Sequence, residues 1–242
     1  MKSISVRNPH SVLEALRRRP QDVQEIHLGE DQPKSLWSEV VSLAEQNRIR
    51  VSRGSGADSS KKNRVGRTSI YEAMIVPKAP LSLNEILEAG GSESEGVWFA
   101  IDCVQDPHNL GAIFRIAGFF DVRGVILPED RTAPLSGVAY DVSCGGVEGV
   151  PFCQETNLAR ALRQAKENDF WILGTSEKAE MGLSEVKRDR KWIVVLGNEE
   201  SGIRENTAKN CDLLCKIPAS GPIDSLNVSV AAGIVAYSLS SS

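Results

Sequence analysis

Three short segments combine polar side chains and glycine where an apolar run passes into a helix. The first, IDCVQDPHNLGAIFRIAGFF (101–120), carries Asn109, Gly111 and Arg115. Asn109 is expected to cap the helix N-terminus, and Gly111 to admit a closely approaching backbone or ligand. Because the residues around Arg115 are mostly apolar, its guanidinium must be paired or face a cleft, since burying an unpaired charge is costly. A buried bridge to a carboxylate and a ligand-binding arginine are equally open at this point.

The second segment, WIVVLGNEESGIRE (192–205), is an apolar strand that enters a turn bracketed by Gly197 and Gly202. These glycines would leave room for a ligand beside exposed amides. The turn carries two acids, Glu199 and Glu200, which could equally be there to favour the N-terminus of a following helix.

The third segment, KIPASGPIDSLNVSVAAGIVAYSL (216–239), is a Pro- and Gly-shaped loop followed by an almost wholly apolar helix. Ser225 is expected to cap this helix. Asn227, two residues later on a buried helix, is harder to explain by capping alone.

Other common chemistries lack their residues in this sequence. There is no GxGxxG and no GxxxxGK[ST], so an oxidoreductase that binds a dinucleotide and a P-loop enzyme both lack a phosphate cradle. The five cysteines form no CxxC and the chain has only three histidines. No metal site is expected, and buried reduced thiols are the better interpretation.

Strands and helices alternate from residue 97 onwards. Short apolar or β-branched runs occur at 97–102, 124–128, 150–154, 170–175, 192–197 and 213–218, with helical patterns at 109–120, 157–168 and 225–239. This alternation predicts an α/β fold with buried parallel strands. Such sheets bind ligands at the carboxyl ends of their strands, where the three segments begin.

A smaller α/β unit is predicted before residue 78. Strands are expected at 23–28, 49–52 and 70–76, helices at 12–18 and 35–47, and a mobile basic loop at 53–69. The run GGSESEG then marks a linker. We therefore divide the chain into a domain at 1–77, a linker at 78–96 and a second domain at 97–242.

Charge is distributed unevenly between the two parts. Residues 1–80 contain 14 Lys and Arg against 9 Asp and Glu, a balance of +5, whereas the rest of the chain has a balance of −9. Such asymmetry can mark a basic binding arm, although basic surfaces are often merely solvated. The N-terminus has no apolar core of a secretory signal, and no apolar run is long enough to span a bilayer. We expect a cytoplasmic protein.

Taken together and in this order, the three segments resemble the SpoU/TrmH family of RNA 2'-O-ribose methyltransferases, in the SPOUT class. The matching motifs are DPHNLGAIFR, VVLGNEESGI and IPASGPIDSLNVSVAAGI, and the stretches LPEDRTAPLS, SCGGVEGVP and TNLAR agree as well. The resemblance covers 97–242 and is strongest to the RlmB-like branch, which methylates a guanosine ribose of large-subunit ribosomal RNA. Residues 1–77 resemble that branch's L30e-like RNA-binding domain more loosely.

The resemblance implies a trefoil-knotted methyltransferase domain, preceded by the L30e-like domain and working as a homodimer on RNA. It implies S-adenosyl-L-methionine as cofactor and no metal. The catalytic residues it implies are Asn109, Arg115, Glu199, Ser225 and Asn227. The cofactor residues it implies are Gly174, Thr175, Gly197, Asn198, Glu199, Ile217 and Leu226. Arg115 is expected to clamp an RNA phosphate and to stabilise the developing alkoxide.

Two other functions stay open. The first is ribose methylation of tRNA in place of rRNA. The second is an inactive relative that binds RNA as an assembly factor, against which the presence of all five catalytic residues argues.

Overall fold

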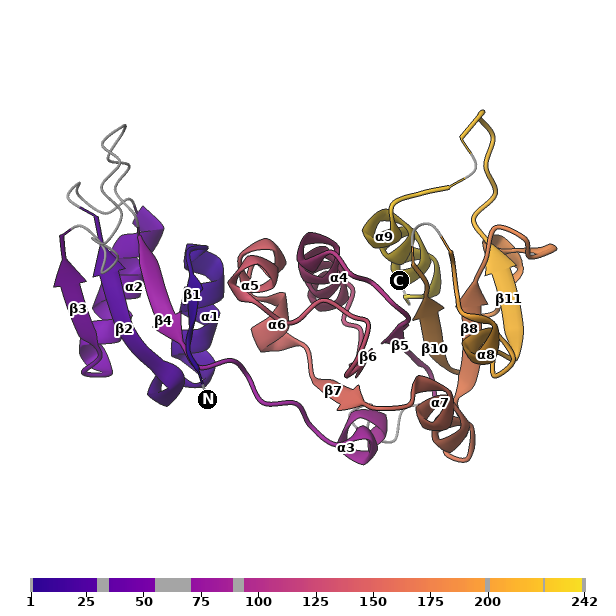
Figure 1. The fold of residues 1–242 in the computed structure, drawn as a ribbon, viewed down its shortest axis with the longest axis horizontal. Helices are drawn as coiled ribbons and strands as arrows, with labels where there is room; N and C mark the ends of the chain where they lie inside the picture. Colours follow the sequence, from indigo (N-terminus) through magenta and orange to yellow (C-terminus); the bar gives the residue numbers. More distant parts are fainter. Residues whose placement is uncertain are drawn as a thin grey trace.

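The computed structural model describes residues 2–29, 35–54, 71–88, 94–198, 201–223 and 225–240 (Figure 1). The chain forms two sheets, a small one from the N-terminal part and a larger one from residue 96 onwards. The predicted basic loop lies outside the described residues except for its first two positions. None of the helices in these ranges is both long and apolar enough to cross a membrane.

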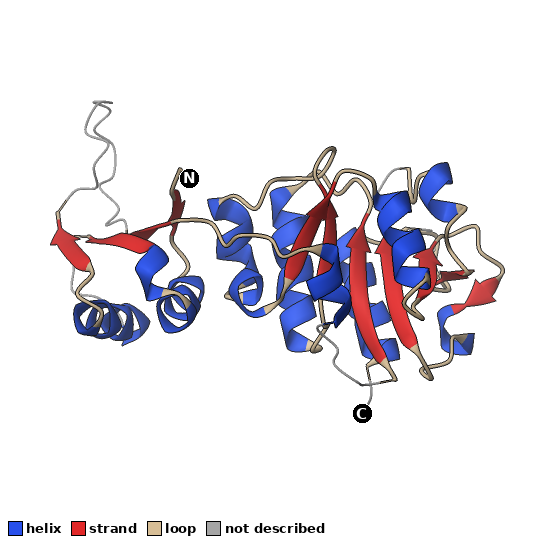
Figure 2. Ribbon diagram, turned by 90° about the horizontal axis from the view of Figure 1, so that it is seen from below, coloured by secondary structure: helices blue, strands red, loops and turns tan. Residues whose placement is uncertain are grey.

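The N-terminal unit is a four-stranded sheet with two helices on one face (Figure 2). Its strands, in spatial order, are β1 (Ile4–Val6), β4 (Glu72–Ile75), β2 (Val23–Leu28) and β3 (Arg50–Arg53). The helices are α1 (Pro9–Arg18), followed by the short 3-10 helix η1 (Pro20–Asp22), and α2 (Ser35–Gln46). Asn8 caps α1 by accepting a hydrogen bond from the His10 amide, and Val12 and Leu16 bury its apolar face. The sheet is mixed, because β2 pairs parallel with β3 and antiparallel with β4.

The larger unit is an entirely parallel seven-stranded sheet. In spatial order its strands are β7 (Phe152–Glu155), β6 (Val125–Pro128), β5 (Gly96–Ile101), β10 (Lys191–Leu196), β8 (Trp171–Thr175), β11 (Leu213–Lys216) and β9 (Met181–Gly182). The order reverses between β5 and β10, which is where open α/β sheets form ligand crevices.

Helices cover both faces of this sheet. They are α3 (Leu83–Glu88), α4 (Pro107–Phe119), α5 (Gly137–Ser143), α6 (Gly146–Gly149), α7 (Leu158–Lys166), α8 (Glu205–Ala208) and α9 (Val228–Leu239), with a 3-10 turn η2 (Leu183–Glu185). Phe99 and the other side chains on its face of β5 pack in the cluster that contains α4 and α9. Trp98, on the opposite face, packs in the cluster that contains α3 and α7. Alternation along the strand therefore joins each face to its own helices.

The predicted α/β class and the parallel sheet are confirmed, and the predicted strands and helices correspond to observed elements. Apart from the 3-10 turns, five further elements, β1, α5, α6, β9 and α8, were not predicted, because they are only two to seven residues long. Within the segment divided off as a linker, 78–96, the helical pattern SLNEILEA (82–89) corresponds to α3. Ile86 is fully buried, and the Leu81 amide donates to the Phe152 carbonyl beside β7 (2.8 Å). At least its first half is therefore packed against the larger sheet.

Candidate functional site

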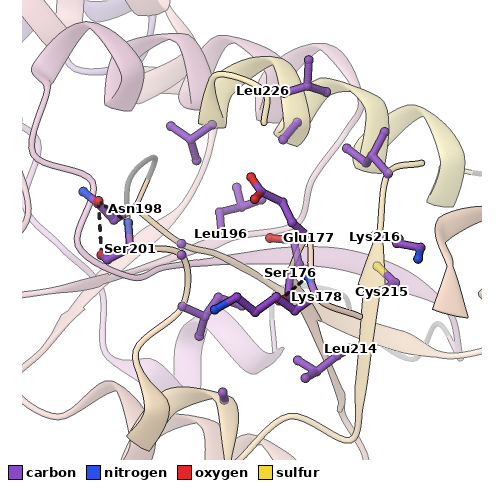
Figure 3. A pocket seen from close by; sticks show the side chains of 18 residues that line it. Ser176, Glu177, Lys178, Leu196, Asn198, Ser201, Leu214, Cys215, Lys216 and Leu226 are labelled. Atoms are coloured by element: carbon purple, nitrogen blue, oxygen red, sulfur yellow. Dashed lines mark hydrogen bonds between the residues drawn. The ribbon is translucent and has the colours of Figure 1, made fainter. Parts of the chain in front are cut away.

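A pocket of about 300 Å³ opens at the carboxyl ends of three neighbouring strands, β8, β10 and β11 (Figure 3). It is lined by residues 175–178 after β8, 196–198 and 201–203 after β10, 214–217 of β11, and by Ala208, Leu226, Val228 and Ala231. Figure 3 shows the carboxylate of Glu177 directed toward the side of the pocket formed by Leu226. The pocket thus combines apolar walls with a few polar groups, which is typical of sites for small organic molecules.

Most of the predicted cofactor residues lie in this pocket. They are Thr175, Gly197, Asn198, Ile217 and Leu226. Gly174 does not line it, because a side chain at that position would point into packed atoms, 2.6 Å from Leu214 Cδ2. Glu199 lies outside the described residues. The sequence interpretation missed Ser176, Glu177 and Lys178, although polar residues that follow an apolar strand in a parallel sheet are a usable signal.

Gly197 and Gly202 have different structural roles. A Cβ on Gly197 would lie 2.4 Å from the Gly202 carbonyl carbon, so the backbones at 197 and 202 can approach this closely only if position 197 lacks a side chain. Gly202 has a φ of +67° and open space around it. The turn is closed by two backbone hydrogen bonds between Asn198 and Gly202 (2.9 and 3.0 Å).

A buried acid anchors the base of this turn. Asp102, immediately after β5, is fully buried and accepts hydrogen bonds from the backbone N (2.9 Å) and the Nε (2.6 Å) of Arg204. Hydrogen bonding to Asp102 raises the pKa of Arg204 above its ordinary value. The amide Nδ2 of Asn198 also donates to the Cys103 carbonyl (3.0 Å). Asp102 and Arg204 were not among the predicted site residues, although an acid at the end of an apolar strand of a parallel sheet is a usable sequence signal.

The first and third motifs meet at one side-chain contact. Asn227 Nδ2 donates to Asn109 Oδ1 over 2.9 Å, which joins the segment before α9 to the first turn of α4. Asn227 also caps α9, since its Oδ1 accepts from the Ser229 amide (2.9 Å). Its neighbours Leu226 and Val228 line the pocket, so one short segment both joins the two motifs and forms part of the pocket wall.

Two of the capping predictions are wrong. The N-cap of α4 is Asp106, whose side chain accepts from the His108 amide, and Asn109 lies within the first turn. The N-cap of α9 is Asn227, and Ser225 lies exposed in the preceding loop. In each case an alternative capping side chain lies within three residues, and sequence patterns alone do not distinguish between the two.

Arg115 is exposed, so the predicted choice between a buried bridge and a cleft does not apply as stated. Among the described residues it makes no hydrogen bond or ion pair and does not line the pocket. Phe119, one turn further along α4, is 81% exposed, so part of the helix's apolar surface lies on its exposed side. The Arg115 side chain therefore lies on the exposed surface of α4.

The thiol of Cys215, which lines the pocket, is unreactive near neutral pH. Burial raises the pKa of Cys215 to about 11, which keeps it protonated near neutral pH. Among the described residues no three His, Cys, Asp or Glu side chains are grouped as a metal site would require. The chemistry available here is that of hydrogen-bonding and charged groups around a small-molecule pocket.

This fold is shared with solved structures of SpoU methyltransferases. The chain belongs to the SpoU rRNA Methylase family, whose model matches residues 96–237.

Its relatives extend beyond that region. It is 37% identical over 232 residues to the 23S rRNA (guanosine-2'-O-)-methyltransferase RlmB of Nitrosomonas europaea, an alignment that covers 94% of this chain and 87% of that protein. Identity to RlmB of Escherichia coli is 35% over 230 residues, with 94% of each chain covered. The fold is also similar to that of the SpoU methyltransferase AviRb from Streptomyces viridochromogenes in complex with AdoMet. There the TM-score is 0.75 at 18% identity, with 98% of this chain and 89% of that chain covered.

Proposed function

We propose that this protein transfers a methyl group from S-adenosyl-L-methionine to the 2'-oxygen of a guanosine ribose in large-subunit ribosomal RNA. The observation that carries the proposal is the pocket at the ends of β8, β10 and β11, lined by five of the residues expected to hold the cofactor. The relatives that match 94% of this chain are named for this reaction on 23S rRNA. A tRNA substrate and an inactive RNA-binding role have no comparable support.

The residues of the pocket fit this cofactor. Leu196, Ile217 and Leu226 provide apolar surface for an adenine ring, and the turn at 197–198 provides backbone polar groups beside it. Glu177 and Lys178 offer charges of both signs for the ammonium and carboxylate of a methionine moiety. No phosphate cradle is needed, because this cofactor carries no phosphate. The expected residue Gly174 would act from behind the pocket wall.

The reaction forms an O–CH₃ bond at the ribose, breaks an S–CH₃ bond and releases the hydroxyl proton. The cofactor supplies an activated methyl group on a sulfonium. Arg115, with its planar guanidinium, would bind an RNA phosphate through two parallel hydrogen bonds and stabilise the negative charge that develops on the 2'-oxygen. Orientation of the two reactants contributes about 7–11 kcal/mol in well-aligned systems.

The remaining catalytic residues would act by positioning. Asn109 is held by Asn227, so its amide is fixed close to the start of α4. Ser225 is exposed beside Leu226, where its hydroxyl can reach a bound nucleotide. Glu199 would contribute a carboxylate to the site.

We further propose a homodimer formed by the exposed side of α4 and α9. Val230, Ile234 and Tyr237 follow helical spacing on the outer face of α9, and Phe119 continues this surface on α4. Tyr237 is 73% exposed, and its ring contacts Phe120 at 6.3 Å between centroids. A second copy would cover this apolar surface and place the junction beside Arg115. The family resemblance adds a trefoil knot around the cofactor and a cytoplasmic location.

RNA capture would depend on the N-terminal unit, as an L30e-like domain. Arg48 and Arg53 are exposed at the end and edge of its sheet, whereas Arg19 is buried and cannot contribute. We expect the double charge reversal Arg48→Glu, Arg53→Glu in the full chain to weaken RNA binding and to reduce the salt dependence of the affinity by about two phosphate contacts. An unchanged slope in a filter-binding salt series would refute this role.

The experiment that tests the function is methylation of 23S rRNA from cells lacking the gene. Radiolabel transfer from S-adenosylmethionine, followed by mapping of the modified ribose, should identify one guanosine. Arg115→Ala should abolish transfer and leave S-adenosylhomocysteine affinity unchanged. Arg115→Lys should also fail, because a point charge cannot replace the bidentate fork. Calorimetry that detected NAD but not S-adenosylhomocysteine, or transfer only to tRNA, would overturn the proposal.

A further inference from the structure

The N-terminal unit contacts the larger unit through a thin layer formed by α5 and α6. Figure 1 shows these two short helices between α1 on one side and α4, which carries Arg115, on the other. The layer is therefore the physical connection between the N-terminal unit and the arginine.

Buried polar contacts fix α1 to this layer. The Ser11 hydroxyl, fully buried, donates to the Tyr140 carbonyl (2.6 Å) and accepts from the Gly145 amide (3.0 Å). Asn8 Nδ2 donates to the Asp141 carbonyl (2.8 Å). A single residue of α1 thus bonds both the end of α5 and the turn before α6.

An ion pair fixes α6 itself. The Nε and Nη2 atoms of Arg19 donate to the two carboxylate oxygens of Glu148 at 2.7 and 2.6 Å, and the two side chains are only 11% and 1% exposed. Burial disfavours the guanidinium charge, but Glu148 outweighs it and the pKa of Arg19 lies above its ordinary value. Lys78 Nζ donates to the carbonyls of Val147, Glu148 and Val150, which satisfies the C-terminal end of α6.

The opposite side of the layer has no free space against α4. A Cβ on Gly146 would lie 2.3 Å from the Phe114 carbonyl oxygen and 2.8 Å from the Arg115 amide nitrogen. A Cβ on Gly111 would lie 2.6 Å from the Ala139 carbonyl oxygen. The backbone of α6 therefore touches the backbone of α4 at Phe114 and Arg115, and the backbone of α5 touches it at Gly111, one turn earlier. Close-packed interiors transmit such displacements because they have few voids to absorb them.

We propose that the N-terminal unit positions Arg115 for methyl transfer, with Ser11 and Arg19 as positioning residues that act through α6. This inference rests on the proposed function and assigns the unit a second task beside RNA capture. A small displacement of α6 would move the Arg115 backbone, and misplacement by about 1 Å can reduce a rate by about 100-fold.

The first test is Arg19→Lys, which keeps the charge but loses the two-pronged contact with Glu148. The matched control is Arg160→Lys, which alters an exposed arginine–glutamate pair remote from the layer. Methyl transfer to 23S rRNA would be measured at varied RNA with saturating cofactor. Arg19→Lys should lower kcat tenfold or more, with KM for RNA and the Kd for S-adenosylhomocysteine within twofold of wild type, and Arg160→Lys should change none of them. A raised KM with unchanged kcat would overturn the inference.

The second test is Ser11→Ala, which removes both hydrogen bonds to the layer but no charge, and is read by amide hydrogen exchange as well as by activity. Faster exchange across α4 and a reduced kcat are expected at a temperature where thermal unfolding shows the protein intact. Unchanged exchange in α4 would overturn the inference even if wild type transferred no methyl group. Failure of the wild-type reaction alone would instead count against the proposed function.

Discussion

Replacement of Asp102 by asparagine should loosen the turn that carries Asn198 and Gly202. The Asp102 carboxylate is fully buried and receives the backbone amide and the guanidinium of Arg204. An asparagine keeps one acceptor but presents an NH₂ group where a second acceptor is needed. The substitution therefore removes the charge and at least one hydrogen bond while preserving side-chain volume.

The expected cost follows from burial. Breaking a wholly buried ion pair costs about 3–5 kcal/mol, because the remaining charge has no partner. The Arg204 side chain is 38% exposed, so water can take over part of its solvation. We therefore expect the free energy of unfolding to fall by about 2–3 kcal/mol, near the lower limit of that range. Urea unfolding followed by tryptophan fluorescence would measure it.

The same change should weaken cofactor binding. Residues 201–203 line the pocket and lead directly into Arg204, so a loosened Arg204 leaves one wall of the pocket less ordered. We expect the Kd for S-adenosylhomocysteine to rise about tenfold, which corresponds to about 1.4 kcal/mol. The control is Glu205→Gln, which removes an exposed pair with Lys209 on α8. If that variant and Asp102→Asn behaved alike in both assays, the anchoring argument would be refuted.

Three further predictions concern other contacts. Asn227→Ala should lower the thermal midpoint, because it removes the α9 cap, which is worth about 1 kcal/mol. Asn227→Ser should keep the cap but still lose methyl transfer. Equal thermal midpoints for the two variants would contradict this prediction. Gly111→Ala should destabilise the protein to urea by about 1–2 kcal/mol by overpacking against α5, whereas Gly118→Ala, with its nearest neighbour at 3.7 Å, should stabilise it. Burial raises the pKa of the Cys153, Cys211 and Cys215 thiols to about 11 or 12, so unfolding releases protons and the stability should fall as pH rises above 9. Iodoacetamide should modify these three thiols much faster in urea than in the native protein.

The main elements of the fold could be predicted because their apolar patterns are long. β10 is buried along almost its whole length and appears in the sequence as an unbroken run of apolar residues. The elements missed were too short to have a period. α6 has four residues, two of them glycine, and its role is visible only where Gly146 meets Phe114. Contacts between residues distant in sequence decide such elements.

The candidate site was predictable where a motif coincides with a strand end. Gly197 and Ile217 follow β10 and β11, and the parallel sheet brings them to one edge. Gly174, also predicted to hold the cofactor, is not among the residues that line the pocket, because a glycine in a strand can equally admit a neighbouring side chain. The Asp102–Arg204 pair joins positions 102 residues apart, and neither residue type nor spacing marks one as the partner of the other.

The layer of α5 and α6 limits how the two units could be recombined. A chimera that carried this larger unit without its own N-terminal unit would uncover Tyr140 and leave the Glu148 carboxylate without Arg19. A graft would have to transfer Ser11, Arg19 and Lys78 together with the surface they fit. A substitution at Ser11 or Arg19 would therefore need a matching change in α5 or α6, so the two units would be exchanged together and not as separate modules.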